Sequence, residues 1–119
     1  MDSHAIVIVD AAGVIRMWSE GATRLFGYDA ASAVGKSLDL IIPESHRERH
    51  WMGFRAAIRS GNSKLDSAAA NLPVLRKDGS VAHYAARLIF LRDAKQEVVG
   101  AAAIYSPNQG GNDPSLPTL

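Results

Sequence analysis

The 119-residue chain contains no cysteine. This absence excludes disulfides, thiolate metal sites, a cysteine nucleophile and a cysteinyl adduct to a chromophore. It also fits a reducing compartment, and we expect a cytoplasmic protein. The formal net charge is only +1, so composition gives no electrostatic reason to expect nucleic acid or an anionic membrane as partner.

Long apolar runs and nucleotide-binding loops are also missing. The N-terminus reaches Asp10 after the short run AIVIV, too soon for a signal peptide. No run approaches the roughly 20 residues of a membrane span, so no membrane contact is expected. Gly110 and Gly111 lie in a polar tail rather than in a phosphate-binding loop, and no Ser-His-Asp set can be assembled. We therefore predict that the chain is not an enzyme.

The sequence that is present fits one globular domain, with 47% apolar and 21% charged residues. We place the domain at residues 1–106 and a flexible tail, rich in Pro, Gly, Asn and Ser, at 107–119. Periodicity and turn residues predict strands at both ends and helices between them. The predicted strands are Ala5–Val9, Val14–Trp18, a small-residue segment within Lys64–Arg76, Val81–Leu91 and Glu97–Tyr105. The predicted helices are Glu20–Phe26, Ala30–Val34 and one that begins near residues 43–45 and ends at Gly61.

The last of these helices carries the main candidate residue. His50 lies at one margin of its apolar side, next to Phe54 and Ala57, while Arg55 and Arg59 lie on the opposite side. A histidine that faces a core is either a packed polar residue or a ligand for something held in that core.

Alanine is frequent on the predicted sheet, and this leaves volume that a ligand can fill. The alternative is a compact core in which Trp51, Phe54 and Tyr84 close the space. Strand alternation puts Ala82, Tyr84, Ala86, Leu88 and Phe90 on one face, which we take as the core face. The other small residues are Ala68, Ala69, Ala70, Ala101, Ala102 and Ala103.

Several motifs occur in an order and spacing that resemble the PAS sensory domain. They are Trp18-Ser19-Glu20-Gly21-Ala22, Leu25-Phe26-Gly27-Tyr28, Val34-Gly35-Lys36, Ile42-Pro43-Glu44 and Arg76-Lys77-Asp78-Gly79-Ser80. The resemblance implies an α+β fold, a five-stranded antiparallel sheet with helices packed on one face. It also implies a sensor in signal transduction and a homodimer, since PAS domains often dimerise. PAS domains bind haem, flavin, small metabolites or nothing.

The segment from Pro43 to His50, PESHRERH, is similar without a gap to the haem-binding PAS domain of FixL-type oxygen-sensor kinases. The resemblance implies that His50 holds the iron of haem b and that a diatomic gas (O₂, CO or NO) or the redox state is sensed. The implied cofactor-binding residues are His50, Trp51, Phe54, Lys64, Ala70, Tyr84, Ala86 and Leu88.

The chain departs from the FixL-type pattern at several positions. The arginine that responds to oxygen falls at Ala70, and one propionate partner falls at Ala56, although Lys64 can replace a second. On the side of the haem where the gas would bind, the resemblance places Ala86 and Leu88. The usual terminal signalling motif is also missing, and Pro107 follows instead. We therefore expect a separate effector protein as partner.

Three alternatives stay open. His46 and His50 have the i, i+4 spacing of a metal clamp, although no carboxylate stands in the usual third position. Arginines between residues 47 and 59 can form a nucleic-acid patch, but Glu44 and Glu48 interleave with them, which is typical of a solvated helix face. Finally, a haem-free PAS module would dimerise, contact a protein or bind a small metabolite.

Overall fold

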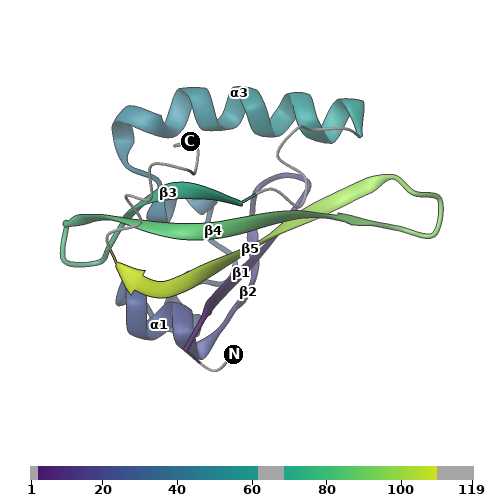
Figure 1. The fold of residues 1–119 in the computed structure, drawn as a ribbon. Helices are drawn as coiled ribbons and strands as arrows, with labels where there is room; N and C mark the ends of the chain where they lie inside the picture. The colour runs from purple at the N-terminus through teal and green to yellow at the C-terminus, as the bar shows by residue number, and fades with distance from the viewer. Residues whose placement is uncertain (1–2, 62–68, 110–119) are drawn as a thin grey trace.

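The computed structural model describes residues 3–61 and 69–109, and it contains one antiparallel sheet of five strands (Figure 1). The strands lie in the order β2-β1-β5-β4-β3. Their bounds are β1 Ala5–Asp10, β2 Ile15–Trp18, β3 Ala69–Leu75, β4 Val81–Arg92 and β5 Val98–Gln109. The helices are α1 Glu20–Phe26, α2 Ala30–Ala33, the 3₁₀ turn η1 Leu38–Ile41 and α3 Glu44–Ser60. This architecture confirms the predicted α+β class.

Local capping explains where the short helices begin. The Ser19 side chain accepts a hydrogen bond from the backbone N–H of Ala22 at 3.1 Å and another from Ile6 at 2.8 Å. One hydroxyl thus caps α1 and ties it to β1. Gly27 ends α1 with φ 95°, a left-handed conformation that glycine adopts without strain. Asp29 caps α2 in the same way as Ser19 caps α1, by accepting a hydrogen bond from the backbone N–H of Ser32.

The last strand is longer than the sequence pattern indicates. We predicted an end at Tyr105, but β5 runs to Gln109 and pairs there with Tyr84 of β4. Pro107 lies where the register shifts between the pairs Ala86–Tyr105 and Tyr84–Gln109. A proline donates no backbone hydrogen bond, and an irregular stretch accommodates it without ending the strand. Residues 110–119 and the segment 64–68 lie outside the described residues.

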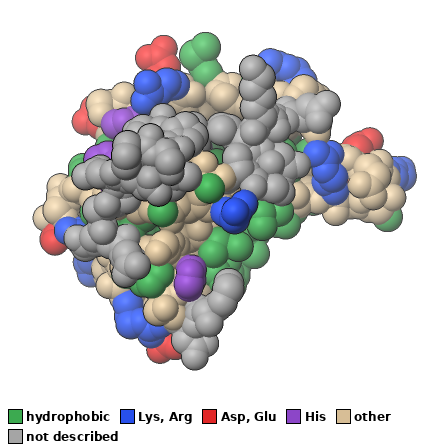
Figure 2. Space-filling view, viewed as in Figure 1, with side chains coloured by type: hydrophobic (Ala, Val, Ile, Leu, Met, Phe, Trp, Pro, Cys, Tyr) green, Lys and Arg blue, Asp and Glu red, His purple; other side chains and the backbone are tan. Residues whose placement is uncertain are grey.

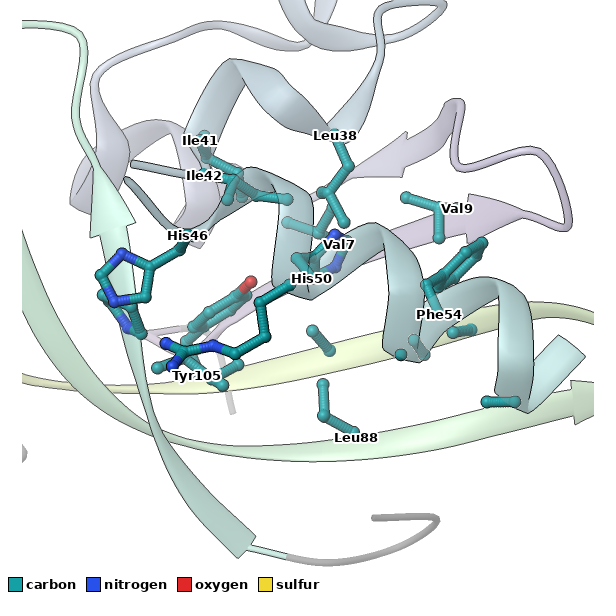
Figure 3. A pocket seen from close by; sticks show the side chains of 18 of the residues that line it. Val7, Val9, Leu38, Ile41, Ile42, His46, His50, Phe54, Leu88 and Tyr105 are labelled. Carbon is teal, nitrogen blue, oxygen red and sulfur yellow. The ribbon is translucent and has the colours of Figure 1, made fainter. Parts of the chain in front are cut away.

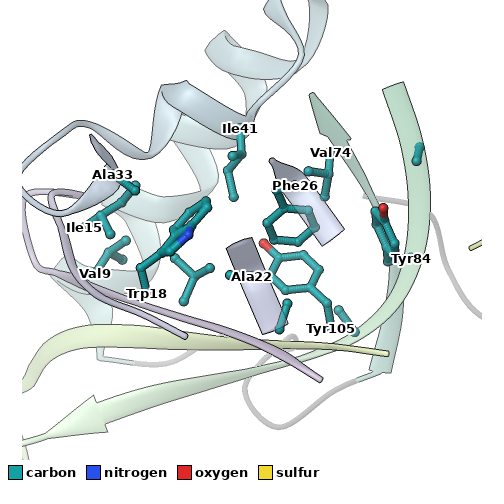
Figure 4. Close-up of a cluster of buried hydrophobic side chains, with 14 residues drawn as sticks. Val9, Ile15, Trp18, Ala22, Phe26, Ala33, Ile41, Val74, Tyr84 and Tyr105 are labelled. Atoms are coloured by element: carbon teal, nitrogen blue, oxygen red, sulfur yellow. The ribbon is translucent and has the colours of Figure 1, made fainter. Parts of the chain in front are cut away.

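The hydrophobic core centres on four aromatic side chains (Figure 4). The Phe26 ring lies 5.0 Å from that of Tyr105, 5.4 Å from Tyr84 and 5.8 Å from Trp18, all in edge-to-face geometry. Burial raises the pKa of the Tyr105 hydroxyl. This group of Trp18, Phe26, Tyr84 and Tyr105, here called the aromatic core, packs α1 onto the sheet.

Helix α3 is attached to the sheet differently from α1, because Ala57 is its only buried residue among those described. Near its beginning, the Arg47 guanidinium donates to the carbonyl of Ile42 at 3.0 Å. At its other end, Arg92 of β4 donates to the carbonyl of Gly61 at 2.7 Å. The helix is therefore held at both ends and lies over the sheet (Figure 1). A pocket lies between the helix and the sheet.

Candidate functional site

A cavity of about 450 Å³ lies between α3 and the sheet (Figure 3). This volume is within the range of small-molecule pockets. Its walls are mostly apolar and come from β1, η1, α3 and the three C-terminal strands. The main apolar lining residues are Val7, Val9, Leu38, Ile41, Ile42, Phe54, Ala57, Leu72, Leu88, Phe90, Ala101, Ala103 and Tyr105.

The His50 imidazole lines this cavity and is held between two aromatic rings. It stacks on Phe54 with ring centroids 5.9 Å apart, and the edge-on Trp51 ring lies 4.7 Å away. Its Nδ1 atom is buried and has no hydrogen-bond partner in the described part of the chain. Burial lowers the pKa of His50, and the nearby Asp39 carboxylate only partly opposes this. The ring is therefore neutral near pH 7, the form that coordinates metals and haem iron.

The residues predicted for the site fall into separate groups. His50, Phe54 and Leu88 meet at the cavity. Trp51 turns towards η1, where its indole N–H donates to Asp39 at 2.6 Å. Tyr84 belongs to the aromatic core. Ala70 and Ala86 are buried in the sheet but are not among the lining residues, and Lys64 lies outside the described residues.

The prediction missed several lining residues. Leu72 and Pro73 of β3 lie at the cavity, as do Ile41 and Ile42 at the end of η1. Alternation along β3 offered a signal, since Ala70, Leu72 and Val74 are apolar residues at alternate positions of the strand. Nothing in the apolar run before Pro43 indicated a 3₁₀ turn that faces the same cavity.

The two histidines of α3 do not form a clamp. Both line the cavity, but the His46 ring points away from that of His50 (Figure 3). His46 Nδ1 instead lies 3.1 Å from the Ser45 hydroxyl. No group of three or more potential metal ligands occurs among the described residues. The arrangement thus offers single-histidine ligation rather than a two-histidine metal site.

The cations of α3 are spread over its surface. Arg49, Arg55 and Arg59 are all exposed, and of these three only Arg49 lines the cavity. On the face shown in Figure 2, Lys and Arg side chains are scattered and acidic side chains lie among them. A single cationic side chain at an apolar cavity suits an acidic group on a bound ligand.

A family model described as PAS fold matches residues 2–107. The chain belongs to the PAS family. Among curated relatives, the sensor protein FixL of Bradyrhizobium diazoefficiens is 37% identical over 46 residues, which are 39% of this chain and 9% of FixL. The oxygen sensor protein DosP of Escherichia coli is 24% identical over 74 residues, 62% of this chain and 9% of DosP. The chain thus spans about a tenth of the length of these relatives.

Solved structures share the PAS fold. A PAS domain from Colwellia psychrerythraea superposes with a TM-score of 0.73 and 23% identity, covering 87% of this chain and 85% of that one. An RNA-binding light-oxygen-voltage receptor gives a TM-score of 0.70 and 22% identity, covering 87% of this chain and 29% of that one. Within residues 3–61 and 69–109, no helix is long and apolar enough to cross a membrane. The PAS family match and the relatives named as sensors together support a PAS sensory domain in signalling.

Proposed function

We propose that this PAS domain binds haem b through His50 and senses a diatomic gas (O₂, CO or NO) or the haem redox state. The observation that carries the proposal is a neutral, half-buried imidazole on an apolar cavity of about 450 Å³. Haem needs a nitrogen ligand, apolar walls for its macrocycle and a polar edge for its propionates.

The residues of the cavity fit such a group. His50 would hold the iron, Phe54 and Leu88 would cover the macrocycle, and Arg49 is a cation within reach of acidic groups at the cavity. When bound, the haem supplies an iron centre that takes up gas ligands or electrons. The protein side chains exclude water, keep the imidazole neutral and fix its position.

The choice of gas follows from the side chains opposite His50. Leu88 offers no hydrogen-bond donor, and Ala70, which the resemblance places where the FixL-type arginine stands, does not line the cavity. Bound O₂ gains more from a donor than CO does, because it carries more negative charge. We therefore expect CO, NO or redox state to be sensed at least as well as O₂.

The comparisons support a sensory role and leave the output open. FixL is named as a sensor and DosP as an oxygen sensor, but this chain matches only a small part of either. A homodimer that acts through a separate effector protein is our proposal for the output.

An absorption spectrum after haem addition tests the proposal. We expect a Soret band in the wild type that is lost or shifted in His50→Ala and kept in the matched control His46→Ala. No Soret band in the wild type, or an unchanged band in His50→Ala, would refute haem ligation by His50.

The alternative function is a haem-free PAS module that dimerises or binds another small molecule. A solved light-oxygen-voltage domain that was studied with a flavin analogue shares the fold, and this makes flavin the first such molecule to test. Because the chain has no cysteine, flavin would be held without a covalent adduct. A protein that stays colourless with haem but co-purifies with a yellow chromophore would favour this alternative. Size-exclusion chromatography with light scattering tests the dimer.

A further inference from the structure

We propose that Trp51 and Asp39 are positioning residues that fix the orientation of the His50 imidazole. The inference rests on the proposed function, because His50 matters as the residue that would hold haem. It assigns a role to two side chains that do not line the cavity.

The hydrogen bond between the two side chains joins α3 to η1. Trp51 Nε1 donates to Asp39 Oδ1 over 2.6 Å, and the bond is partly buried. A hydrogen bond to a charged acceptor is stronger than one between neutral groups. It therefore holds the indole against rotation.

The far side of the indole is held by the turn between β1 and β2. A Cβ atom added to Gly13 would lie 2.2 Å from Trp51 Cη2, so the ring packs directly on the glycine backbone. Gly13 has φ 81°, which makes any other residue strained there. The indole is thus clamped between Asp39 and Gly13.

The clamped indole of Trp51 in turn limits the rotation of the His50 imidazole. The Trp51 and His50 rings meet edge to face, with centroids 4.7 Å apart and planes at 79°. A ligating histidine is normally oriented by a hydrogen bond from its second ring nitrogen. His50 Nδ1 has no such partner among the described residues, so ring packing must supply the orientation.

Arg47 provides a matched control for this arrangement. It lies one turn before Trp51 and also ties α3 to the segment around η1, through the carbonyls of Ile42 and Asp39. It makes no ring contact with His50. Loss of Arg47 therefore loosens the same attachment without removing the packing on the imidazole.

Proton NMR of the haem-free protein tests the positioning directly. We expect the His50 ring protons to be shifted by the neighbouring aromatic rings in wild type, Asp39→Asn and Arg47→Gln. Asparagine keeps an oxygen that accepts the indole N–H. In Asp39→Leu the ring-proton shifts should move towards the values of an unstructured histidine. Wild-type shifts in Asp39→Leu, or an equal change in Arg47→Gln, would overturn the proposal.

Haem titration gives the second readout. The affinity should fall about tenfold in Asp39→Leu and Trp51→Phe, the equivalent of one lost hydrogen bond. It should stay near the wild-type value in Asp39→Asn and Arg47→Gln. Equal affinity in all four variants would contradict a positioning role. A wild type that binds no haem would refute the proposed function, and the NMR result would still decide whether Trp51 and Asp39 orient His50.

Discussion

The aromatic core and the cavity beneath α3 share strands but differ in packing. The aromatic core is filled, with Phe26 in contact with three other rings. The cavity has an open volume of about 450 Å³ above alanines of the same sheet. The difference indicates that folding stability comes mainly from the aromatic core, while ligand capacity lies under α3.

The change from filled to open occurs along one strand. Four residues of β5 line the cavity, namely Ala101, Ala102, Ala103 and Tyr105, and Tyr105 also belongs to the aromatic core. Small side chains at 101 and 103 leave room that the large ring at 105 closes. The small side chains of β5 thus contribute to the open volume, while Tyr105 joins the cavity to the aromatic core.

The largest expected loss of folding stability comes from a substitution in the aromatic core. Phe26→Ala should lower the free energy of unfolding by about 4 kcal/mol, because the side chain is 1% exposed and its loss leaves a void. Phe54→Ala should cost about 1 kcal/mol, because Phe54 is only partly buried and already borders open space. Urea unfolding measures both values. Equal losses would contradict the division between the two regions.

Adding volume should have opposite effects in the two regions. Ala103→Leu should stabilise the fold by about 1 kcal/mol, because the side chain enters existing space, and it should block ligand uptake. Ala22→Leu should destabilise by about 2 kcal/mol, because Ala22 is fully buried against the aromatic core. Thermal unfolding and haem titration report both results. Destabilisation by both substitutions would show that the cavity cannot accept a larger side chain.

The stability of the cavity side should depend on pH through His50. Burial holds its folded-state pKa below the unfolded value of 6.5, so the unfolded chain binds the proton more readily. The contribution of the neutral His50 to the free energy of unfolding is complete above pH 6.5. It is lost as the pH falls from 6.5 towards the folded-state pKa, by about 1.4 kcal/mol for each pKa unit that separates the unfolded and folded values. Urea unfolding at a series of pH values should show a smaller slope between pH 5 and 7 in His50→Phe than in wild type. Identical slopes would contradict a buried neutral imidazole.

The smallest expected effect concerns the end of α3. Arg92→Ala removes a 2.7 Å hydrogen bond to the carbonyl of Gly61, and should cost about 0.5 kcal/mol because the site is exposed. The exposed Lys95 of the same hairpin provides the control Lys95→Ala. Hydrogen exchange should speed up in the last turn of α3 in Arg92→Ala alone. Faster exchange in the aromatic core as well would show that α3 is not attached independently.

Local signals in the sequence were sufficient for much of the fold. Ser19 and Asp29 cap the predicted helices, and the alternation of β4 correctly buries Ala82, Tyr84 and Ala86. Helical periodicity also places His50 and Phe54 on the side that faces the cavity. These features depend on residues a few positions apart.

Long-range contacts decided what the sequence could not predict. Trp51 lies near the apolar side of α3, but the acceptor that turns it away is Asp39, in a 3₁₀ turn that has no clear pattern. Tyr84 faces the core as predicted, but it packs on Phe26 of α1 and does not line the cavity with His50, because contacts between residues far apart in the chain decide its place. The extension of β5 to Gln109 likewise depends on its partner strand.

We propose that His50 holds haem in the cavity beneath α3. The most direct measurement is the absorption spectrum of the haem-reconstituted protein, recorded for wild type, His50→Ala and His46→Ala. We expect a Soret band in wild type and His46→Ala that is lost or shifted in His50→Ala. A wild type without a Soret band, or a band that His50→Ala leaves unchanged, would contradict it.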